Sequence, residues 1–449
     1  MPSSKKQSKT KYILSFLLFL MTFSFSFWSN SELKPQISDD SGGYIRLAKD
    51  FTDEVAEIRP FFYPLFLKIC MNINSENWMA TYCLLQLLFH SFMIVALFFL
   101  FQIFKLNNTS SFILSLVIGL NPNLIYYSTH LYADHFFAIL TTISWIFTIR
   151  FLKQRYSGDQ KILNLILIGI FSGLAIVTKP IALLMIFPIV FSILSIYGIN
   201  KKIIKVTILL VIINFSGHFL WGSYKTKINP DLKFELLDFI ELSINCTALR
   251  AGLVDAAIGT PLYIYLKDND MLETARSFKI KYSYTMDLQP GFWEFKNSIP
   301  WDLKNDKAFA VKVIKNEPIK LFIASIGNWH SFFTKRCFFP GNQAEAFIGI
   351  PNPVLRFYKV SYSLLYRPFL LFFFILSSFF LWSRKEFVLL FPSFSYILYA
   401  SLTVVILSAH GGEFIRYRVW IEYIMWFYCL FPIGYLIDLF TRKIRNHFK

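Results

Sequence analysis

Long apolar runs recur along this chain, and they constrain its fold more than any other feature. Runs of about 18 or more residues can cross a hydrocarbon core about 30 Å thick. Inside a bilayer only helices and closed barrels satisfy the backbone hydrogen bonds. The runs lack the period-two alternation of barrel strands. The charged fraction is 16%, against about 25% in soluble domains. The sequence therefore predicts an all-α integral membrane protein.

Ten transmembrane helices are expected. Their predicted positions are residues 12–28, 80–104, 110–127, 134–152, 162–178, 180–198, 205–222, 362–383, 386–408 and 418–440. The first run follows a basic segment but is long and aromatic-rich and lacks a small-x-small cleavage site, which favours an uncleaved anchor over a signal peptide.

The formal charge of +17 is distributed as the positive-inside rule requires. The basic clusters between the apolar runs are Lys5, Lys6, Lys9 and Lys11; Lys153, Arg155 and Lys161; Lys201, Lys202 and Lys205; Arg384 and Lys385; and Arg442, Lys443, Arg445 and Lys449. With ten crossings and a cytoplasmic N-terminus, every cluster falls in the cytoplasm, and so does the C-terminus. No basic stripe marks a soluble module, so no nucleic-acid partner is expected.

Two long segments are then expected on the outer side. The first, about 30–79, mixes charged and apolar residues at Tyr44–Ile58, which predicts an interfacial helix. The second, about 223–361, predicts a mixed external domain, in which Leu321–Phe333 is apolar but short for a span and predicts a membrane-dipping helix. The expected organisation is a transmembrane module at 1–222, an extracytoplasmic domain at 223–361 and C-terminal transmembrane helices at 362–449. A disulfide between Cys246 and Cys337 of the external domain is left open.

Three aspartates are expected at the outer membrane surface. Asp39 and Asp40 follow the first span, where they can simply cap a solvated helix. An acid at this level can instead serve as a general base for a hydroxyl acceptor. Asp134 lies outside as well, between the third and fourth spans, near His130 and His135. These histidines lack a repeated ligand spacing, so no metal site is expected.

Four cations are expected at the same level, against the positive-inside bias. Arg59 lies in the first outer segment, Lys179 at a tight hairpin between two spans, and Arg416 and Arg418 precede the last span. A guanidinium can bind a phosphate through two parallel hydrogen bonds. The structural alternatives are an interfacial anchor for Arg59, snorkelling for Lys179, and pairing with Glu413 for the two later arginines.

Taken together, these motifs resemble the GT-C superfamily of glycosyltransferases, which use polyprenyl-phosphate-linked sugars. The likeness is to the bacterial protein-mannosyltransferase-like and aminoarabinose-transferase-like branch. The residues that match its first outer loop are Asp40, Tyr44 and Ala48, followed by Arg59-Pro60 and Tyr63-Pro64. NPNLIYYSTHLYADHFF, GLAIVTKPIALL and RYR resemble three later segments of that family, in the same order.

The resemblance implies an inverting transfer in which Asp40 is the catalytic base and Asp134 assists it or positions the acceptor. Arg59, Lys179, Arg416 and Arg418 are then expected to bind the donor phosphate, supported by Asp39, Tyr44 and Tyr63. No general acid is needed, because polyprenyl phosphate leaves as a stable anion. No cofactor is required, and the participation of a divalent metal is left open. The implied partners are a polyprenyl-phosphate sugar donor, a glycan, lipid or protein hydroxyl acceptor, and membrane lipid.

The implied location is a bacterial or archaeal plasma membrane, with the active site on the extracytoplasmic face. Two alternatives remain open. One is a transporter or flippase of lipid-linked sugars, which would place charges mid-span and repeat its helices. The other is a membrane glycan ligase or polymerase, which would lack the Asp-x-x-x-Tyr pattern of the first loop.

Overall fold

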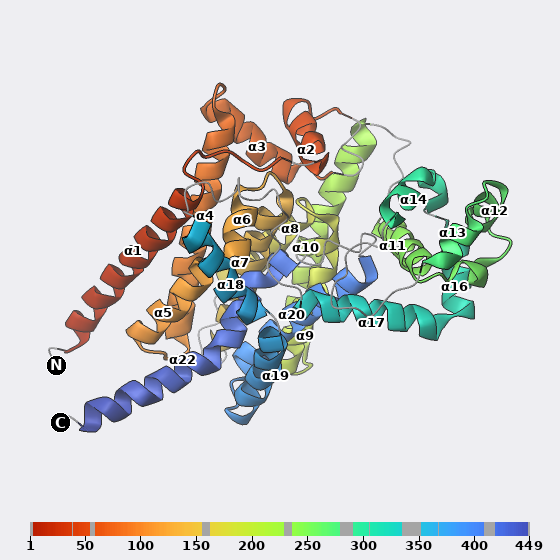
Figure 1. Cartoon of the computed structure of the whole chain (residues 1–449). Coiled ribbons are helices and arrows are strands. Elements are labelled where there is room, and N and C mark those ends of the chain that lie inside the picture. The colour runs from red at the N-terminus through yellow and green to blue at the C-terminus, as the bar shows by residue number, and fades with distance from the viewer. Residues whose placement is uncertain are drawn as a thin grey trace. The chain divides into compact units, whose positions relative to one another are not determined.

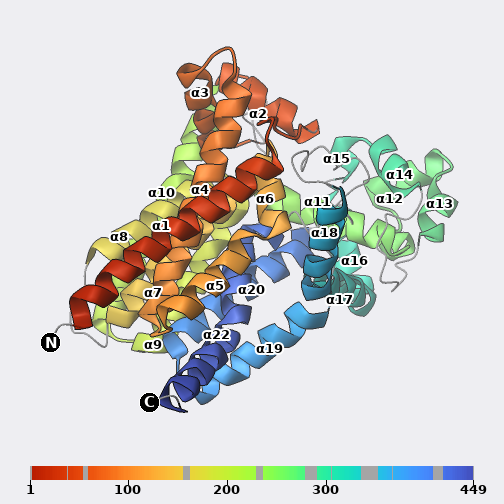
Figure 2. The same ribbon diagram turned by 60° about the vertical axis from the view of Figure 1, so that its left-hand side comes forward.

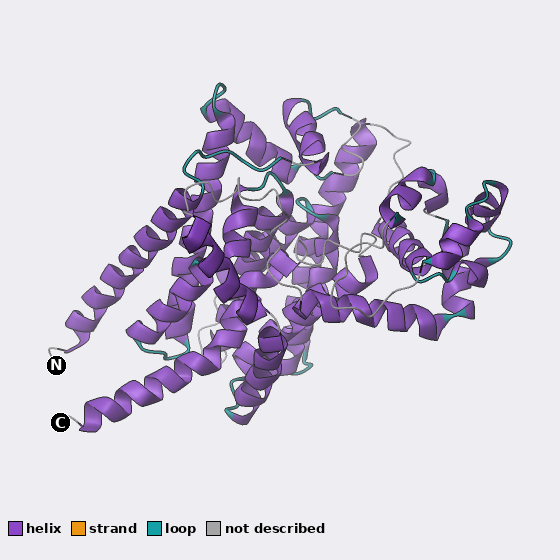
Figure 3. Cartoon of the chain, in the orientation of Figure 1, coloured by secondary structure: helices purple, strands orange, loops and turns teal. Residues whose placement is uncertain are grey.

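The computed structural model describes residues 3–37, 39–53, 59–154, 162–228, 236–278, 291–304, 306–334, 352–366, 368–407 and 418–447. Every regular element in these ranges is a helix (Figure 3). The chain divides into two compact units. Unit 1 comprises Met1–Leu232, Arg336–Ile397 and Val419–Lys449, and unit 2 comprises Lys233–Lys335 and Leu398–Arg418. The bounds differ from the expected 223–361 domain, because 336–361 is grouped with unit 1 and 398–418 with unit 2.

Unit 1 is a bundle of long apolar helices (Figure 1). Its elements are α1 (Ser3–Ser29), α2 (Asp39–Lys49), α3 (Phe62–Ile73), α4 (Trp78–Ile103), α5 (Asn108–Gly119), α6 (Pro122–Thr129), α7 (Ala133–Lys153), α8 (Ile162–Ile176), η3 (Pro180–Met185), α9 (Ile186–Tyr197), α10 (Lys201–Ile228), α18 (Asn352–Tyr366), α19 (Pro368–Ser383), the first part of α20 (Phe387–Leu407), η6 (Val419–Ile421) and α22 (Glu422–His447). Helix α1 packs on α4, α4 on α5, α7 on α8, and α8 on α10. Helix α22 packs against α5 and α19.

Six helices in the described ranges are long and apolar enough to cross a membrane. They are Lys9–Ser29, Trp78–Ile103, Ala133–Lys153, Pro180–Tyr197, Lys201–Lys227 and Val419–Thr441. The bent pair α5–α6 would make a seventh. Three further predicted spans coincide with shorter apolar helices, Ile162–Ile176, Leu370–Ser383 and Phe387–Thr403. The all-α membrane class is confirmed, whereas the count of ten crossings stays a prediction.

The span expected at 110–127 is broken where α5 ends and α6 begins, and the two helices meet at 51°. Asn121 caps α6 by accepting a hydrogen bond from the backbone nitrogen of Asn123, and Pro122 follows the cap. Proline lacks a backbone N–H and clashes with the preceding helical turn, but it suits the first position of a new helix. The sequence Asn121-Pro122 therefore starts a helix and does not continue one.

The interfacial helix expected at Tyr44–Ile58 begins and ends earlier, as α2. Carboxylates are favourable in the first turn of a helix, and Asp39 and Asp40 occupy that turn. After α2, the Asp50 carboxylate accepts hydrogen bonds from the backbone nitrogen and hydroxyl of Thr52, at 2.9 and 2.7 Å. This Asx-type turn leads the chain away from the helix. Residues 54–58 lie outside the described part of the chain.

Both chain ends lie at one end of unit 1, and α2 and α3 lie at the opposite end (Figures 1 and 2). The predicted outer loop is thus separated from the two termini along the helices of this unit.

Unit 2 is a small helical domain around an apolar core. Its elements are α11 (Leu236–Arg250), η4 (Val254–Ala257), α12 (Pro261–Asp268), α13 (Leu272–Ser277), α14 (Phe292–Ser298), α15 (Trp301–Lys304), α16 (Lys307–Asn316), α17 (Pro318–Thr334) and the last part of α20. Residues such as Leu262, Phe292 and Phe309 form the core. Cys246 is a free, buried thiol, and burial raises its pKa to about 11. Cys337, the proposed disulfide partner, lies outside the described residues.

Candidate functional site

The predicted base and the first predicted phosphate ligand form an ion pair. Asp40 lies in the first turn of α2, and Arg59 lies in the segment that leads into α3. Arg59 Nη2 donates to Asp40 Oδ1 at 2.6 Å. Both side chains are partly open to solvent, with 33% of Asp40 and 20% of Arg59 exposed. Molecules at this surface can therefore reach both the carboxylate and the guanidinium.

Aromatic packing holds Arg59 in place. Its guanidinium carbon lies 4.4 Å from the centroid of the Tyr44 ring, one turn after Asp40 on α2. Burial lowers the pKa of Arg59, but its interactions with Tyr44 and Asp40 outweigh this effect and raise the pKa above its usual value. Arg59 is therefore a permanent cation at any working pH.

Tyr44 packs against Tyr63, which in turn contacts Tyr82. The rings of Tyr44 and Tyr63 meet edge to face at 4.9 Å, and both side chains are buried. The Tyr63 hydroxyl donates to that of Tyr82 at 3.1 Å, and Tyr82 donates to the carbonyl oxygen of His130 at 2.6 Å. The supporting roles of Tyr44 and Tyr63 stay predictions, and Tyr82 is a member of this cluster that the sequence did not reveal.

A second ion pair joins the predicted residues Asp134 and Lys179. Asp134 lies in the first turn of α7, and Lys179 lies at the hairpin before η3. Lys179 Nζ donates to Asp134 Oδ1 at 2.7 Å, and the same oxygen accepts a bond of 2.6 Å from Trp420 Nε1. Lys179 also lies 4.9 Å from the Trp420 ring. Asp134 is fully buried while 12% of Lys179 is exposed, so only the cation of this pair faces outward.

Backbone and side-chain bonds bring the segments of the two pairs together. Ser41, next to Asp40, donates its hydroxyl to the carbonyl oxygen of Leu131 at 3.0 Å. The backbone nitrogen of Phe62 donates to the carbonyl oxygen of Val177 at 3.0 Å, just before the Lys179 hairpin. The structure thus assembles the first loop, the start of α7 and the hairpin into one region of unit 1.

No contact joins the three remaining predicted residues to either ion pair among the interactions described above. Arg418 is fully buried in unit 2, where Nη1 donates to the carbonyl oxygen of Phe332 at 3.1 Å. Arg416 lies outside the described residues. Asp39 is the first residue of α2. The phosphate-binding roles of both arginines and the supporting role of Asp39 stay predictions.

His135, next to Asp134, belongs to a polar chain in the helical core. Its Nδ1 is 2.8 Å from Gln86 Oε1, and its Nε2 is 2.9 Å from the Tyr423 hydroxyl. That hydroxyl is also 2.7 Å from His90 Nδ1. Both ring nitrogens of His135 are therefore engaged by protein groups. Among the described residues, no group of three or more His, Cys, Asp or Glu side chains is placed to hold a metal ion.

The sequence reasoning missed Trp420 and Tyr423. Trp420 lies in η6 and Tyr423 in the first turn of α22, both close after Arg418, and they contact the adjacent residues Asp134 and His135. The available signal was their proximity to the RYR motif. Polar-tipped aromatic residues in an apolar segment usually need a hydrogen-bond partner when buried.

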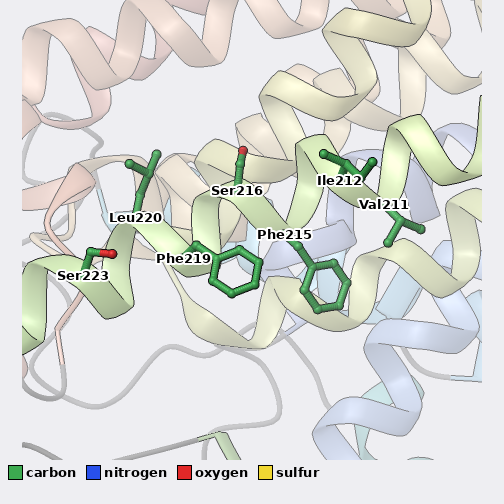
Figure 4. A pocket seen from close by; sticks show the side chains of 7 residues that line it. All are labelled: Val211, Ile212, Phe215, Ser216, Phe219, Leu220 and Ser223. Carbon is green, nitrogen blue, oxygen red and sulfur yellow. The ribbon is translucent and has the colours of Figure 1, made fainter.

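An apolar groove of about 560 Å³ runs along α10 (Figure 4). Its lining residues are Val211, Ile212, Phe215, Ser216, Phe219, Leu220 and Ser223. None of them is a predicted site residue. The next residue, Tyr224, packs its ring 5.4 Å from that of Phe61, two positions after Arg59. The groove therefore ends beside the first loop.

Comparison with known families supports the expected class. Residues 58–221 match the family model described as dolichyl-phosphate-mannose-protein mannosyltransferase, a family of GT-C type. The predicted resemblance is confirmed over this segment, which includes Arg59, Asp134 and Lys179 but not Asp40. Nothing among the curated proteins matches the chain. The match and the apolar helices support a multi-pass membrane glycosyltransferase that uses a lipid-linked sugar.

Proposed function

We propose that the protein transfers a sugar from a polyprenyl-phosphate donor to a hydroxyl acceptor on the extracytoplasmic face of the membrane. The observation that carries this proposal is the partly exposed Asp40–Arg59 pair. It sets one accessible carboxylate beside a fixed cation, in a region that also contains the Lys179 cation.

Asp40 accepts the proton of the acceptor hydroxyl, whose oxygen forms a bond to the anomeric carbon. The bond from that carbon to the phosphate oxygen breaks on the opposite side, so the anomeric centre inverts. The polyprenyl phosphate leaves with the electron pair, and cations stabilise the charge that develops there. Because the phosphate is already a good leaving group, no general acid is needed.

Arg59 is the first ligand of that phosphate. A guanidinium has five N–H donors, and the contact with Asp40 uses Nη2. A bound phosphate would compete with Asp40 for Arg59, so donor binding loosens the ion pair and leaves the carboxylate ready to take a proton. Lys179 is the second cation, and Asp134 holds it in position from inside the bundle. Arg416 and Arg418 remain proposed further ligands.

The donor's apolar tail lies along the α10 groove. The groove is apolar apart from two serines, and Tyr224 and Phe61 connect its end with the Arg59 segment. A tail held there would leave the sugar phosphate at the first loop.

The test is sugar transfer from labelled polyprenyl-phosphate sugars in membranes that contain the wild type, Asp40→Asn or Asp53→Asn. Asp53 is a matched control, since it lies in the same loop and contacts Arg46 at 3.7 Å. Loss of a general base typically lowers the rate by about 10²–10⁴-fold, so we expect this loss in Asp40→Asn and near-normal transfer in Asp53→Asn. Normal transfer by Asp40→Asn, at equal expression, would remove Asp40 from the mechanism. No transfer by the wild type with any of several sugar donors would favour a flippase.

A further inference from the structure

Helices α16 and α17 of unit 2 each bury one face and expose large apolar side chains on another. Helix α16 buries Phe309 and Val313 in the core of the unit. Helix α17 buries Ala324, Phe332 and Phe333. The exposed apolar residues are Val311 (53%), Ile314 (45%), Ile319 (71%), Phe322 (64%) and Ile323 (41%), and we call this set the α16–α17 stripe.

Within each helix, the members of the stripe follow the spacing of one helix face. On α17 its members lie at positions i, i+3 and i+4, which share a face. Phe322 is the aromatic member of the stripe, and nearly two-thirds of its surface is exposed. Apolar residues gathered in this way usually mark an interaction surface.

The surroundings of the stripe are basic. Lys307, Lys312, Lys315 and Lys320 are all exposed on these two helices. The acidic residue between the helices is Glu317, which pairs with Lys320 at 2.7 Å. An apolar face edged by lysines is complementary to a bilayer surface, where acyl chains lie beneath anionic headgroups.

The same geometry argues against a helix that enters the membrane end-on. The sequence predicted that Leu321–Phe333 dips into the bilayer, but Phe332 and Phe333, near the C-terminal end of this segment, are buried. The Phe332 carbonyl oxygen also accepts a bond from Arg418 of the same unit. Its C-terminal end is therefore not available to enter the bilayer, whereas its exposed apolar residues lie along its side.

We propose that the α16–α17 stripe docks unit 2 on the surface of a lipid bilayer that contains anionic headgroups. We choose a bilayer as the partner because the same chain has helices long and apolar enough to cross a membrane, which keep unit 2 attached to a membrane protein. This inference concerns the contact between unit 2 and the membrane, and it does not depend on the sugar-transfer chemistry.

The test uses the full-length chain in nanodiscs of phosphatidylcholine and phosphatidylglycerol, with a nitroxide label on Phe322→Cys. Cys337→Ser removes the one cysteine outside the described residues, and the other four are buried. A label on Asn269→Cys, at an exposed polar turn after α12, is the matched control. Collision rates with oxygen and with a water-soluble nickel chelate report the depth of each label.

We expect the Phe322 label to favour oxygen over the chelate, at a depth of about 5–10 Å, as for interfacial helices. The Asn269 label should favour the chelate. In phosphatidylcholine alone the Phe322 label should lie shallower, and an unchanged depth would overturn the role of the lysines. A Phe322 label that meets the chelate as readily as the control overturns the docking. A label shielded from both reagents overturns it too, and spin–spin broadening would then identify a second copy of the chain as the occupant.

Discussion

Lys179 and Asp134 lie 45 residues apart in the chain and form an ion pair of 2.7 Å, of which the carboxylate is fully buried. The pair ties the hairpin before η3 to the first turn of α7, and Trp420 adds a bond from a third segment. Buried pairs of this kind contribute little net stability, yet breaking one is costly because a buried charge loses its partner.

Asp134→Asn should destabilise the protein, because Lys179 loses its ion-pair partner. The loss should stay below the about 3–5 kcal/mol of a fully buried unpaired charge, since 12% of Lys179 is exposed. The double variant Asp134→Asn with Lys179→Met should recover much of this loss, since neither charge remains. Thermal unfolding in detergent measures the stability of the single and the double variant. A double variant no more stable than Asp134→Asn would argue against the pair as the cause.

The same double variant separates structure from function. If Lys179 contacts the donor phosphate, sugar transfer stays low although stability returns. Transfer that recovers together with stability would limit Lys179 to a structural role.

Trp420→Phe should destabilise the protein by about 1.5–3 kcal/mol, the value of a hydrogen bond to a charged group. Phenylalanine keeps an aromatic ring, but a smaller one, so only the loss beyond that of a matched control reports the bond to Asp134. Trp221→Phe is the matched control, because Trp221 is buried and its indole nitrogen has no hydrogen-bond partner among the described residues. Equal losses in the two variants would show that ring packing, and not the bond, is responsible.

Gly217→Ala should weaken the packing of α10 against α8. A Cβ at Gly217 would lie 2.6 Å from the carbonyl oxygen of Gly173, so the two backbones would have to separate. Overpacking of this kind costs about 1–3 kcal/mol. At Gly222, also on α10, a Cβ would meet nothing within 4 Å. Gly222→Ala should therefore be neutral or stabilising by up to about 1 kcal/mol. The two glycine variants are compared by their unfolding midpoints in detergent. Equal midpoints would contradict close packing at Gly217.

Ser110→Ala should loosen the contact between α5 and α22. The Ser110 hydroxyl donates to Asp438 Oδ1, and Oδ2 of the same carboxylate accepts from the backbone nitrogen of Asn107 at 2.8 Å. Loss of the hydroxyl should lower stability by about 1.5–3 kcal/mol. The hydroxyl of its neighbour Ser111 is buried and has no partner among the described residues. Ser111→Ala should leave the unfolding midpoint nearly unchanged, and a comparable loss there would point to helix propensity or packing as the cause.

Local patterns predicted some elements well and others less well. The tight hairpin at Lys179 is present, because Pro180 cannot continue α8 and starts η3. Asn121-Pro122 carries an equally clear break signal, but its apolar surroundings suggested one continuous span. Helix α2 begins before its predicted start, because Asp39 and Asp40 lie in its first turn and do not precede it.

The sequence by itself determined the membrane class, the set of apolar helices and the identity of the charged residues in the segments between them. These properties depend on residue composition and on spacing along a short stretch of chain. An apolar run long enough to cross a bilayer must form a helix there, because its backbone groups can bond only to one another. Asp40, Arg59, Asp134 and Lys179 were all identified from such local motifs.

Only the tertiary structure decided which charges meet. Asp40 pairs with Arg59 and Asp134 with Lys179, and Trp420 reaches Asp134 across 286 residues. The tertiary structure also decided that Asp40 is partly exposed to solvent, whereas Asp134 is fully buried. Such contacts depend on how helices distant in sequence pack against one another, and no local spacing encodes that packing.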